Sequence, residues 1–261
     1  MYAIDDADDP RLADYVDLTD PDLRKRTETE RGFFIAESPH VVTRLLASGR
    51  TVRSVLVTPE QWTVMHDLLE PLTVPVYVAP PYVLRRVVGF DLHRGVVAAA
   101  DRWPLPSLAD VVRGAQRIAV CEAINDHENL GVMFRSAAAL GVDAMLVDEA
   151  CADPWYRRCV RVSIGHVITL PWTRITRLAE VHDAGFTTVA CTPAGGAPAI
   201  DTITWPERTA LLFGAEGPGL SDAWLAGADL HARIPMHEGA DSLNVATAAA
   251  LCFWEAKKGA E

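Results

Sequence analysis

The sequence has too few suitably spaced cysteines for a disulfide framework or a zinc site. Its five cysteines are Cys121, Cys151, Cys159, Cys191 and Cys252, an odd number with no CxxC pair. This usage indicates reduced thiols in a cytoplasmic protein. We therefore expect neither structural disulfides nor a bound metal.

The sequence also lacks a hydrophobic run long enough to cross a membrane. The longest uncharged run, residues 184–200, has 17 residues and is interrupted by prolines and glycines. A spanning helix needs about 20 mostly apolar residues. The N-terminus is acidic and has no basic region of a secretory signal. We expect a cytoplasmic protein without membrane contacts.

Basic residues are in the minority, with 24 Lys and Arg against 35 Asp and Glu. The net charge of -11 argues against a non-specific DNA coat protein. The balance is uneven, because residues 1–22 sum to -7, residues 23–104 to +3 and residues 105–261 to -7. The basic middle part, which includes Arg24, Lys25 and Arg26, leaves nucleic acid binding open beside the alternative of ordinary solvated faces.

The chain has 261 residues, 49% of them hydrophobic, which is enough for one large domain or two modest ones. Two prolines within residues 101–107 predict a boundary after residue 104. Before it, β-like runs alternate with helical patterns such as residues 39–47, which predicts a small α/β domain over residues 1–104. Its acidic first 22 residues are expected to be partly flexible. The predicted strands are 32–36, 54–57, 74–78 and 96–100.

After the boundary the alternation of strands and helices is clearer. It predicts an α/β domain over residues 105–261 with a mainly parallel sheet that is buried on both faces. The predicted strands are 117–122, 144–147, 167–170, 187–191, 209–213 and 231–234. The predicted helices are 130–140, 155–164, 175–184, 221–225 and 243–257.

A first polar patch, residues 125–141, follows a strand and opens an apolar helix. Asn129 is predicted to cap this helix and Gly141 to end it. Arg135 is the only charge within residues 130–140. A guanidinium on so apolar a helix needs an anionic partner, which could be a ligand or a structural ion pair.

A second patch, residues 211–220, runs from a hydrophobic strand into a loop with three glycines. The pattern is G-x-E-x-x-G, from Gly214 through Glu216 to Gly219, and not the dinucleotide-binding G-x-G-x-x-G. Glycines allow the backbone to approach a ligand closely, while the carboxylate disfavours a diphosphate. A tight turn with a capping Glu is the alternative interpretation.

A third patch, residues 234–246, leads from a strand into the C-terminal helix. Asp241 or Ser242 is predicted to cap that helix, and the two lysines at 257 and 258 suit its C-terminal end. A well-capped helix would explain most of the patch. It explains Asn244 least, because Asn is a weak helix former whose side chain prefers local hydrogen bonds.

Together, in this order and spacing, the three patches resemble the sequence motifs of the SpoU (TrmH-type) RNA ribose 2′-O-methyltransferases of the SPOUT superfamily. The residues that carry the resemblance are Asn125 or Asp126, Asn129 and Arg135; Gly214, Glu216 and Gly219; and Ile234, Pro235, Met236, Ser242, Leu243, Asn244, Val245 and Ala246. The stretch Arg161-Val-Ser-Ile-Gly165 is also similar to the family. The similarity covers about 150 residues, the whole C-terminal part.

The N-terminal part resembles, more loosely, a small ribosomal-protein-like substrate-binding domain that is often fused in this family. The similar stretches are Gly32-Phe-Phe-Ile-Ala-Glu37 and Gly89-Phe-Asp-Leu-His93-Arg94-Gly95. The resemblance implies a trefoil-knotted C-terminal domain and a homodimer formed through it, although knots are rare in general.

The resemblance further implies S-adenosylmethionine as the methyl donor. The residues expected to bind it are Thr192, Pro193, Phe213, Gly214, Glu216, Gly217, Ile234, Pro235, Met236, Ser242 and Leu243. The residues expected to act in catalysis are Arg135, Asn129, Glu216, Ser242 and Asn244. Three histidines near these patches, His127, His166 and His237, are expected to be surface or packing residues.

Arg135 is the main catalytic candidate. Because a guanidinium has a pKa above about 12, we expect it to grip a phosphate and stabilise alkoxide charge, although the family has also been interpreted with the arginine as a general base.

We expect the substrate to be 23S rRNA, because a fused domain suits a large folded RNA. The alternatives are tRNA, a catalytically silent RNA-binding protein, and a nucleotide-dependent dehydrogenase, which the missing glycine fingerprint disfavours.

Overall fold

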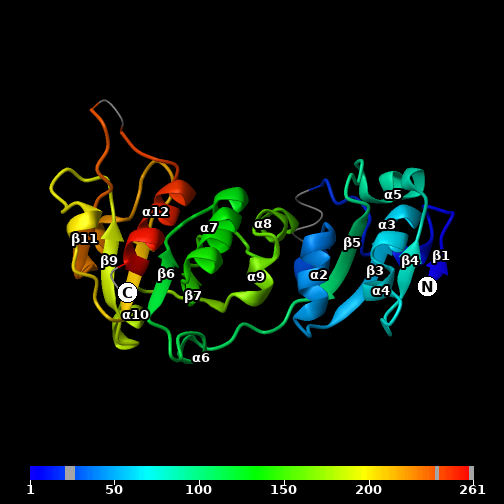
Figure 1. Ribbon diagram of the computed structural model, residues 1–261, viewed down its shortest axis with the longest axis horizontal. Coiled ribbons are helices and arrows are strands. Elements are labelled where there is room, and N and C mark those ends of the chain that lie inside the picture. Colours follow the sequence, from blue (N-terminus) through cyan, green and yellow to red (C-terminus); the bar gives the residue numbers. More distant parts are fainter. Residues whose placement is uncertain (21–26, 239–240, 259–261) are drawn as a thin grey trace. The chain divides into compact units, whose positions relative to one another are not determined.

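The computed structural model describes residues 1–20, 27–238 and 241–258, and it separates into two compact units (Figure 1). Unit 1 comprises Met1–Pro104 and Trp155–Thr169, and unit 2 comprises Leu105–Pro154 and Leu170–Glu261. The basic residues 24–26 lie outside the described residues.

Residues 155–169 differ from the division that the sequence suggests, because they pack within unit 1 and not with the rest of residues 105–261. The Trp155 ring lies 4.8 Å from that of Phe34, centroid to centroid. Arg157 forms an ion pair with the buried Glu37. Aromatic packing and a buried charge pair thus attach this segment to unit 1.

Unit 1 contains a five-stranded mixed sheet. Its order is β1 (Tyr2–Ala3), β4 (Val76–Val78), β3 (Val52–Val57), β5 (Val96–Asp101) and β2 (Phe33–Glu37). The first three strands are parallel, and β5 is antiparallel to both of its neighbours. The helices of this unit are η1 (Pro10–Leu12), α2 (Pro39–Ala47), α3 (Pro59–Val64), α4 (His66–Leu69), α5 (Pro81–Val88), α8 (Arg157–Val162) and α9 (His166–Thr169).

The acidic N-terminal segment is part of the core of unit 1 over residues 1–20. Leu12, Tyr15 and Leu18 are fully buried among residues from β2, β3 and α5. The Tyr15 hydroxyl lies 2.7 Å from that of Ser54, and burial raises the pKa of this tyrosine. The segment therefore differs from the partly flexible leader that the sequence suggests. Regularly spaced apolar residues lie among its aspartates, and they anchor it.

Unit 2 contains a six-stranded sheet in which every pair of neighbours is parallel. Its order is β11 (Leu230–Ala232), β9 (Thr187–Cys191), β10 (Thr209–Phe213), β6 (Arg117–Cys121), β7 (Ala144–Val147) and β8 (Trp172–Arg174). The helices of this unit are α6 (Leu108–Val111), α7 (His127–Leu140), α10 (Ala179–Asp183), η2 (Ile200–Thr202), α11 (Asp222–Gly227) and α12 (Val245–Lys258).

Both faces of this parallel sheet are covered, as expected for a parallel sheet with apolar strands. Ile118 and Val120 of β6 belong to a core cluster with residues of α6 and α10. On β10, Phe213 packs edge-to-face against Phe253 of α12, with ring centroids 5.5 Å apart. Helices α12 and α7 pack against each other (Figure 1). The α/β fold with a mainly parallel sheet is thus confirmed.

One predicted strand is wrong. Residues 167–170 belong to the single-turn helix α9 and to the residue after it, and the strand is β8, beyond Pro171. Short apolar runs do not distinguish a strand from a buried helical turn by their pattern. The trefoil knot stays a prediction. No helix in the described residues has the length and apolar character needed to span a bilayer.

Candidate active site

The three polar patches meet at the carboxyl edge of the parallel sheet in unit 2. The first patch follows β6, which ends at Cys121, and the glycine loop of the second follows β10, which ends at Phe213. The third patch follows β11, and β9 ends at Cys191 on the same edge. Parallel strands direct their carboxyl ends to one edge, which is where open α/β sheets bind ligands. The topology therefore brings the first patch beside the other two, although Asn129 and Asn244 are 115 residues apart in the chain.

Asp126, and not Asn129, caps helix α7. Its carboxylate accepts hydrogen bonds from the backbone N–H groups of Glu128 and Asn129, both at 2.8 Å. An aspartate is favoured there because its charge also complements the helix dipole. The predicted cap is wrong by three residues, which leaves the side chain of Asn129 available for other contacts.

Asn244 joins the three patches through its side-chain amide. The amide nitrogen donates to Asn129 Oδ1 at 2.8 Å and to Glu216 Oε1 at 2.7 Å. The amide oxygen accepts from the backbone N–H groups of Ala246 and Thr247, at 3.1 and 3.2 Å, and so caps α12. The cap is therefore Asn244 rather than Asp241 or Ser242. We call the contact of Asn129, Glu216 and Asn244 the amide junction.

Only an asparagine fits the centre of the amide junction. A primary amide has two N–H donors and one carbonyl acceptor, and Asn244 uses all of them. An aspartate would keep the cap but would place a second carboxylate against Glu216. This geometry explains why Asn244 stands at this position, which a capped helix alone does not explain.

The glycine-rich loop after β10 folds back tightly on itself. The backbone N–H of Gly219 donates to the carbonyl of Ala215 at 2.9 Å. A Cβ on Gly214 would overlap the backbone of Gly219 and Leu220, so this position requires glycine. The loop presents Glu216 to the amide junction.

A second contact, which the sequence did not reveal, closes this loop. The Glu122 carboxylate accepts hydrogen bonds from the Ser221 N–H at 2.8 Å and from the Ser221 hydroxyl at 2.6 Å. The Ser221 hydroxyl in turn caps α11, accepting from the Trp224 N–H at 3.3 Å. Glu122 lies three residues before the first patch and Ser221 directly follows the second, and that proximity was the only signal available.

Two neighbouring cavities lie beside the amide junction, with volumes of about 410 and 70 Å³. Predicted donor-binding residues around the larger cavity are Thr192, Pro193, Phe213, Gly214, Glu216, Gly217, Ser242 and Leu243. Ile234 and Met236 line the smaller one, and Pro235 lines neither. Cys191 and Ala248 line both cavities and were not predicted. We call the two together the edge cavity.

The wall of the edge cavity includes an uncharged thiol. A hydrogen bond with Cys252, together with burial, raises the pKa of Cys191 well above its ordinary value. A protonated thiol is a weak nucleophile. The wall is thus neutral at this point, and Glu216 supplies the carboxylate.

Arg135 is exposed on α7 and lines neither part of the edge cavity. Within residues 1–20, 27–238 and 241–258 no hydrogen bond or ion pair involves its guanidinium. It follows Asn129 by six residues, which places it on another side of the helix. The structural ion pair is therefore absent in this part of the chain, and the guanidinium is accessible to a ligand.

The three histidines lie outside the edge cavity. His127 begins α7, His237 is exposed, and His166 belongs to unit 1. In the part of the chain that the structure describes, no cluster of three or more His, Cys, Asp or Glu residues is arranged to hold a metal ion.

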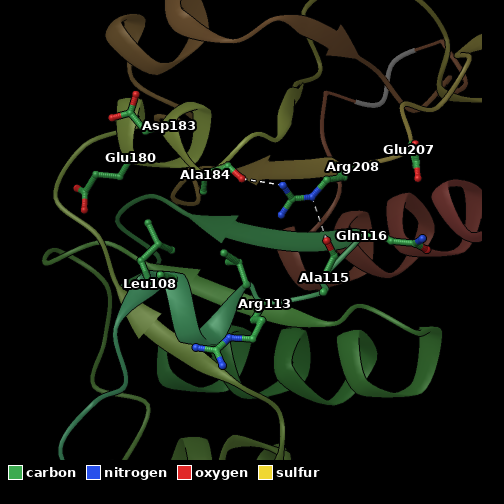
Figure 2. A pocket seen from close by; sticks show the side chains of 12 residues that line it. Leu108, Arg113, Ala115, Gln116, Glu180, Asp183, Ala184, Glu207 and Arg208 are labelled. Carbon is green, nitrogen blue, oxygen red and sulfur yellow. Dashed lines mark hydrogen bonds between the residues drawn. The ribbon is translucent and has the colours of Figure 1, made fainter.

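A larger cavity of about 720 Å³ lies at the amino edge of the same sheet (Figure 2). Arg208 borders it and donates to the carbonyls of Ala115 and Ala184, at 3.2 and 2.8 Å. The lining of this cavity carries charges of both signs: the carboxylates of Glu180, Asp183 and Glu207, and the guanidiniums of Arg113 and Arg208. None of the predicted site residues borders this cavity.

The fold and the site together define an α/β protein with a cavity at the carboxyl edge of a parallel sheet, the edge at which enzymes of this class bind their ligands. Residues 116–254 match the model of the SpoU rRNA Methylase family. The chain therefore belongs to this family and is an RNA methyltransferase.

Two relatives span nearly the whole chain. An uncharacterized tRNA/rRNA methyltransferase of Mycobacterium tuberculosis is 49% identical, and the match covers 96% of this chain and 89% of that protein. The 23S rRNA (guanosine(2553)-2′-O)-methyltransferase RlmP of Bacillus subtilis is 29% identical, with coverage of 97% and 98%.

Solved structures agree with the fold. An RNA 2′-O ribose methyltransferase superposes with a TM-score of 0.81 at 28% identity and covers 99% of each chain. The SpoU methyltransferase AviRb of Streptomyces viridochromogenes, solved with AdoMet, superposes with a TM-score of 0.80 at 25% identity, covering 96% of this chain and 97% of that one.

Proposed function

We propose that this protein transfers a methyl group from S-adenosylmethionine to a ribose 2′-hydroxyl of 23S rRNA in the cytoplasm. The observation that carries the proposal is the amide junction, which holds three distant segments together beside the edge cavity. The relative RlmP, whose name states 2′-O methylation of 23S rRNA, supports the choice of reaction and substrate.

The edge cavity suits S-adenosylmethionine in size and chemistry. Its larger part, about 410 Å³, falls within the range of about 300–1,000 Å³ usual for small-molecule pockets. Backbone of the loops at Thr192, Gly217 and Leu243 would hold the donor, and the Glu216 carboxylate in the cavity lining would favour its positive charge. When bound, S-adenosylmethionine supplies an electrophilic methyl group on a sulfonium. The protonated Cys191 thiol does not compete for that methyl group.

The residues of the chain would orient and stabilise the reacting groups. The amide junction fixes Glu216 and the start of α12, and so fixes Ser242 and Leu243 at the cavity wall. Correct alignment of the 2′-oxygen is worth several kcal/mol, up to about 7–11 in ideal cases. The Arg135 guanidinium would grip a phosphate of the target and stabilise the negative charge that develops on the 2′-oxygen.

Two further parts of the molecule have proposed roles. Unit 1, whose residues 23–104 carry a net charge of +3, would bind the RNA.

Helices α7 and α12 leave Val132, Leu251 and Trp254 exposed at 36%, 42% and 48%. Exposed apolar groups on two packed helices suit a subunit interface, so we propose a homodimer formed through unit 2.

Methyl transfer from tritiated S-adenosylmethionine to unmodified transcripts tests the function. Purified protein would be incubated with bacterial 23S rRNA and with tRNA in parallel. Alkali-resistant dinucleotides that carry label from 23S rRNA are the expected result, because 2′-O-methylation blocks alkaline cleavage. Label in tRNA alone would reassign the substrate. Donor binding without label in either RNA would identify a silent RNA-binding protein and contradict the proposal.

A further inference from the structure

A separate cavity of about 610 Å³ lies wholly within unit 1. It is formed by the turn between β2 and α2, the loop after α5, and residues of α8 and the turn that follows it. The side chains that define its chemistry are those of Glu37, His40, Phe90, His93, Arg94 and Arg161. We call it the basic cleft.

The carboxylates of the basic cleft are already neutralised by nearby arginines. Glu37, which is buried, is paired with Arg157. That arginine also donates to the Leu18 carbonyl at 3.1 Å and lies over the Phe90 ring at 4.8 Å, so it serves the fold. The second acid, Asp91, lies 3.5 Å from Arg85.

The two arginines of the basic cleft keep donors available. Arg94 is exposed and has no bond to any of the described residues. Arg161 is 44% exposed, and its ion pair with Glu37 is long at 3.7 Å. The imidazoles of His40 and His93 are exposed beside them and have no partner within the same described ranges. The uncompensated charge of the basic cleft is therefore positive.

The backbone around the basic cleft is held in unusual conformations. Ser38 has φ 93° and ψ 152°, and Ile164 has φ 52°. Both residues line the cavity, and neither is a glycine. Such conformations cost of order 1–3 kcal/mol each and are concentrated at functional sites. Arg44 bonds to the carbonyl of Ile164, which helps to hold the second turn.

We propose that the basic cleft binds a phosphodiester group of the RNA substrate, with Arg94 and Arg161 as its main donors. Arginine is suited to this because its planar fork donates two hydrogen bonds to phosphate oxygens. Such contacts position an RNA without reading its sequence. The inference rests on the proposed function, since it names where unit 1 would hold the same substrate.

The test compares two double variants of the full-length protein. R94A/R161A removes both donors, whereas R11A/R86A removes two exposed arginines of unit 1 that lie outside the basic cleft and are paired with Asp9 and Asp8. Affinity for labelled 23S rRNA would be measured over a range of salt concentrations. Affinity for S-adenosylmethionine would be measured by calorimetry, with thermal unfolding as the folding control.

We expect R94A/R161A to bind the RNA about 10- to 100-fold more weakly. The slope of log affinity against log salt should fall by about 0.7 to 0.9, the loss of one phosphate contact. Donor affinity should stay unchanged, and R11A/R86A should behave as the wild type. Equal RNA affinity and slope in both double variants would overturn the proposal.

Two outcomes separate this inference from the proposed function and from the binding of a free anion. If wild-type protein neither binds S-adenosylmethionine nor methylates RNA, the proposed function fails, while the RNA affinities still decide the role of the basic cleft. Titration with inorganic phosphate, followed by the NMR signals of the arginine Nε–H groups, tests a free anion as the ligand. Saturation at micromolar phosphate that is lost in R94A/R161A would overturn the assignment to RNA, and no saturation at millimolar phosphate would support it.

Discussion

The polar side chains of the amide junction in unit 2 bond to one another, whereas those of the basic cleft in unit 1 remain uncommitted. Asn244 uses every polar atom of its amide on the protein itself. Arg94 uses none on the described residues. A site that aligns a reaction needs rigid groups, while a site that grips a large charged polymer needs free donors. Arg135 in unit 2 also keeps its donors uncommitted, so it resembles the arginines of the basic cleft and not the side chains of the amide junction.

Arg135 gives the largest expected effect. Arg135→Ala should lower the rate of methyl transfer about 10²- to 10³-fold, because it removes a donor to charge that develops in the reaction. Affinity for S-adenosylmethionine should not change, since Arg135 lines neither part of the edge cavity. Single-turnover kinetics with tritiated donor measure this. Arg113→Ala, an exposed arginine paired with Asp110, is the control. Full activity of the Arg135→Ala variant would remove Arg135 from the mechanism.

Asn244 comes next. Asn244→Asp keeps the acceptor that caps α12 but sets a carboxylate against Glu216, so the junction should open. Displacement of the reacting groups by about 1 Å costs about 100-fold in rate. Asn244→Ala should in addition lose about 1 kcal/mol of the free energy of unfolding through the missing cap. Lys258→Ala, at the other end of the same helix, is the control. A variant Asn244→Asp with wild-type kcat would mean that the junction is structural only.

Gly214 tests whether the loop needs its close turn. Gly214→Ala should lower the free energy of unfolding by about 2 kcal/mol, because the new Cβ overlaps the backbone of Gly219. Chemical denaturation measures the change. Gly196→Ala, at a position with open space, should cost much less. Similar losses at both positions would show that the turn is not tight in solution.

Glu122 and Ser221 give the smallest effect. Removing either should cost about 1 kcal/mol and weaken donor binding modestly, because both hydrogen bonds join the loop to the end of β6. A double-mutant cycle with Glu122→Ala and Ser221→Ala should show a coupling of at least about 0.5 kcal/mol. Additive effects would mean that the contact does not hold the loop.

The sequence predicted the parallel sheet because apolar strands are visible locally in the chain. Of the eleven donor-binding residues that the family resemblance implied, ten line the edge cavity. The sequence did not predict that Asn244 joins Asn129 to Glu216, nor that Glu122 bonds to Ser221. Those contacts depend on side-chain geometry between distant segments. The attachment of residues 155–169 to unit 1 was missed for the same reason, since the partners of Trp155 lie far away in the chain.

The most direct test of the central claim is calorimetric titration of S-adenosylmethionine into wild-type protein and the variant Ala248→Phe. Ala248 borders both parts of the edge cavity, and its side chain makes none of the polar contacts of the amide junction, so a phenyl group there would take up space that the donor needs. Lys258→Phe, exposed at the other end of the same helix, is the control. The account predicts binding to the wild type and to Lys258→Phe, and none to Ala248→Phe. Equal binding by all three proteins would place the donor elsewhere and contradict it.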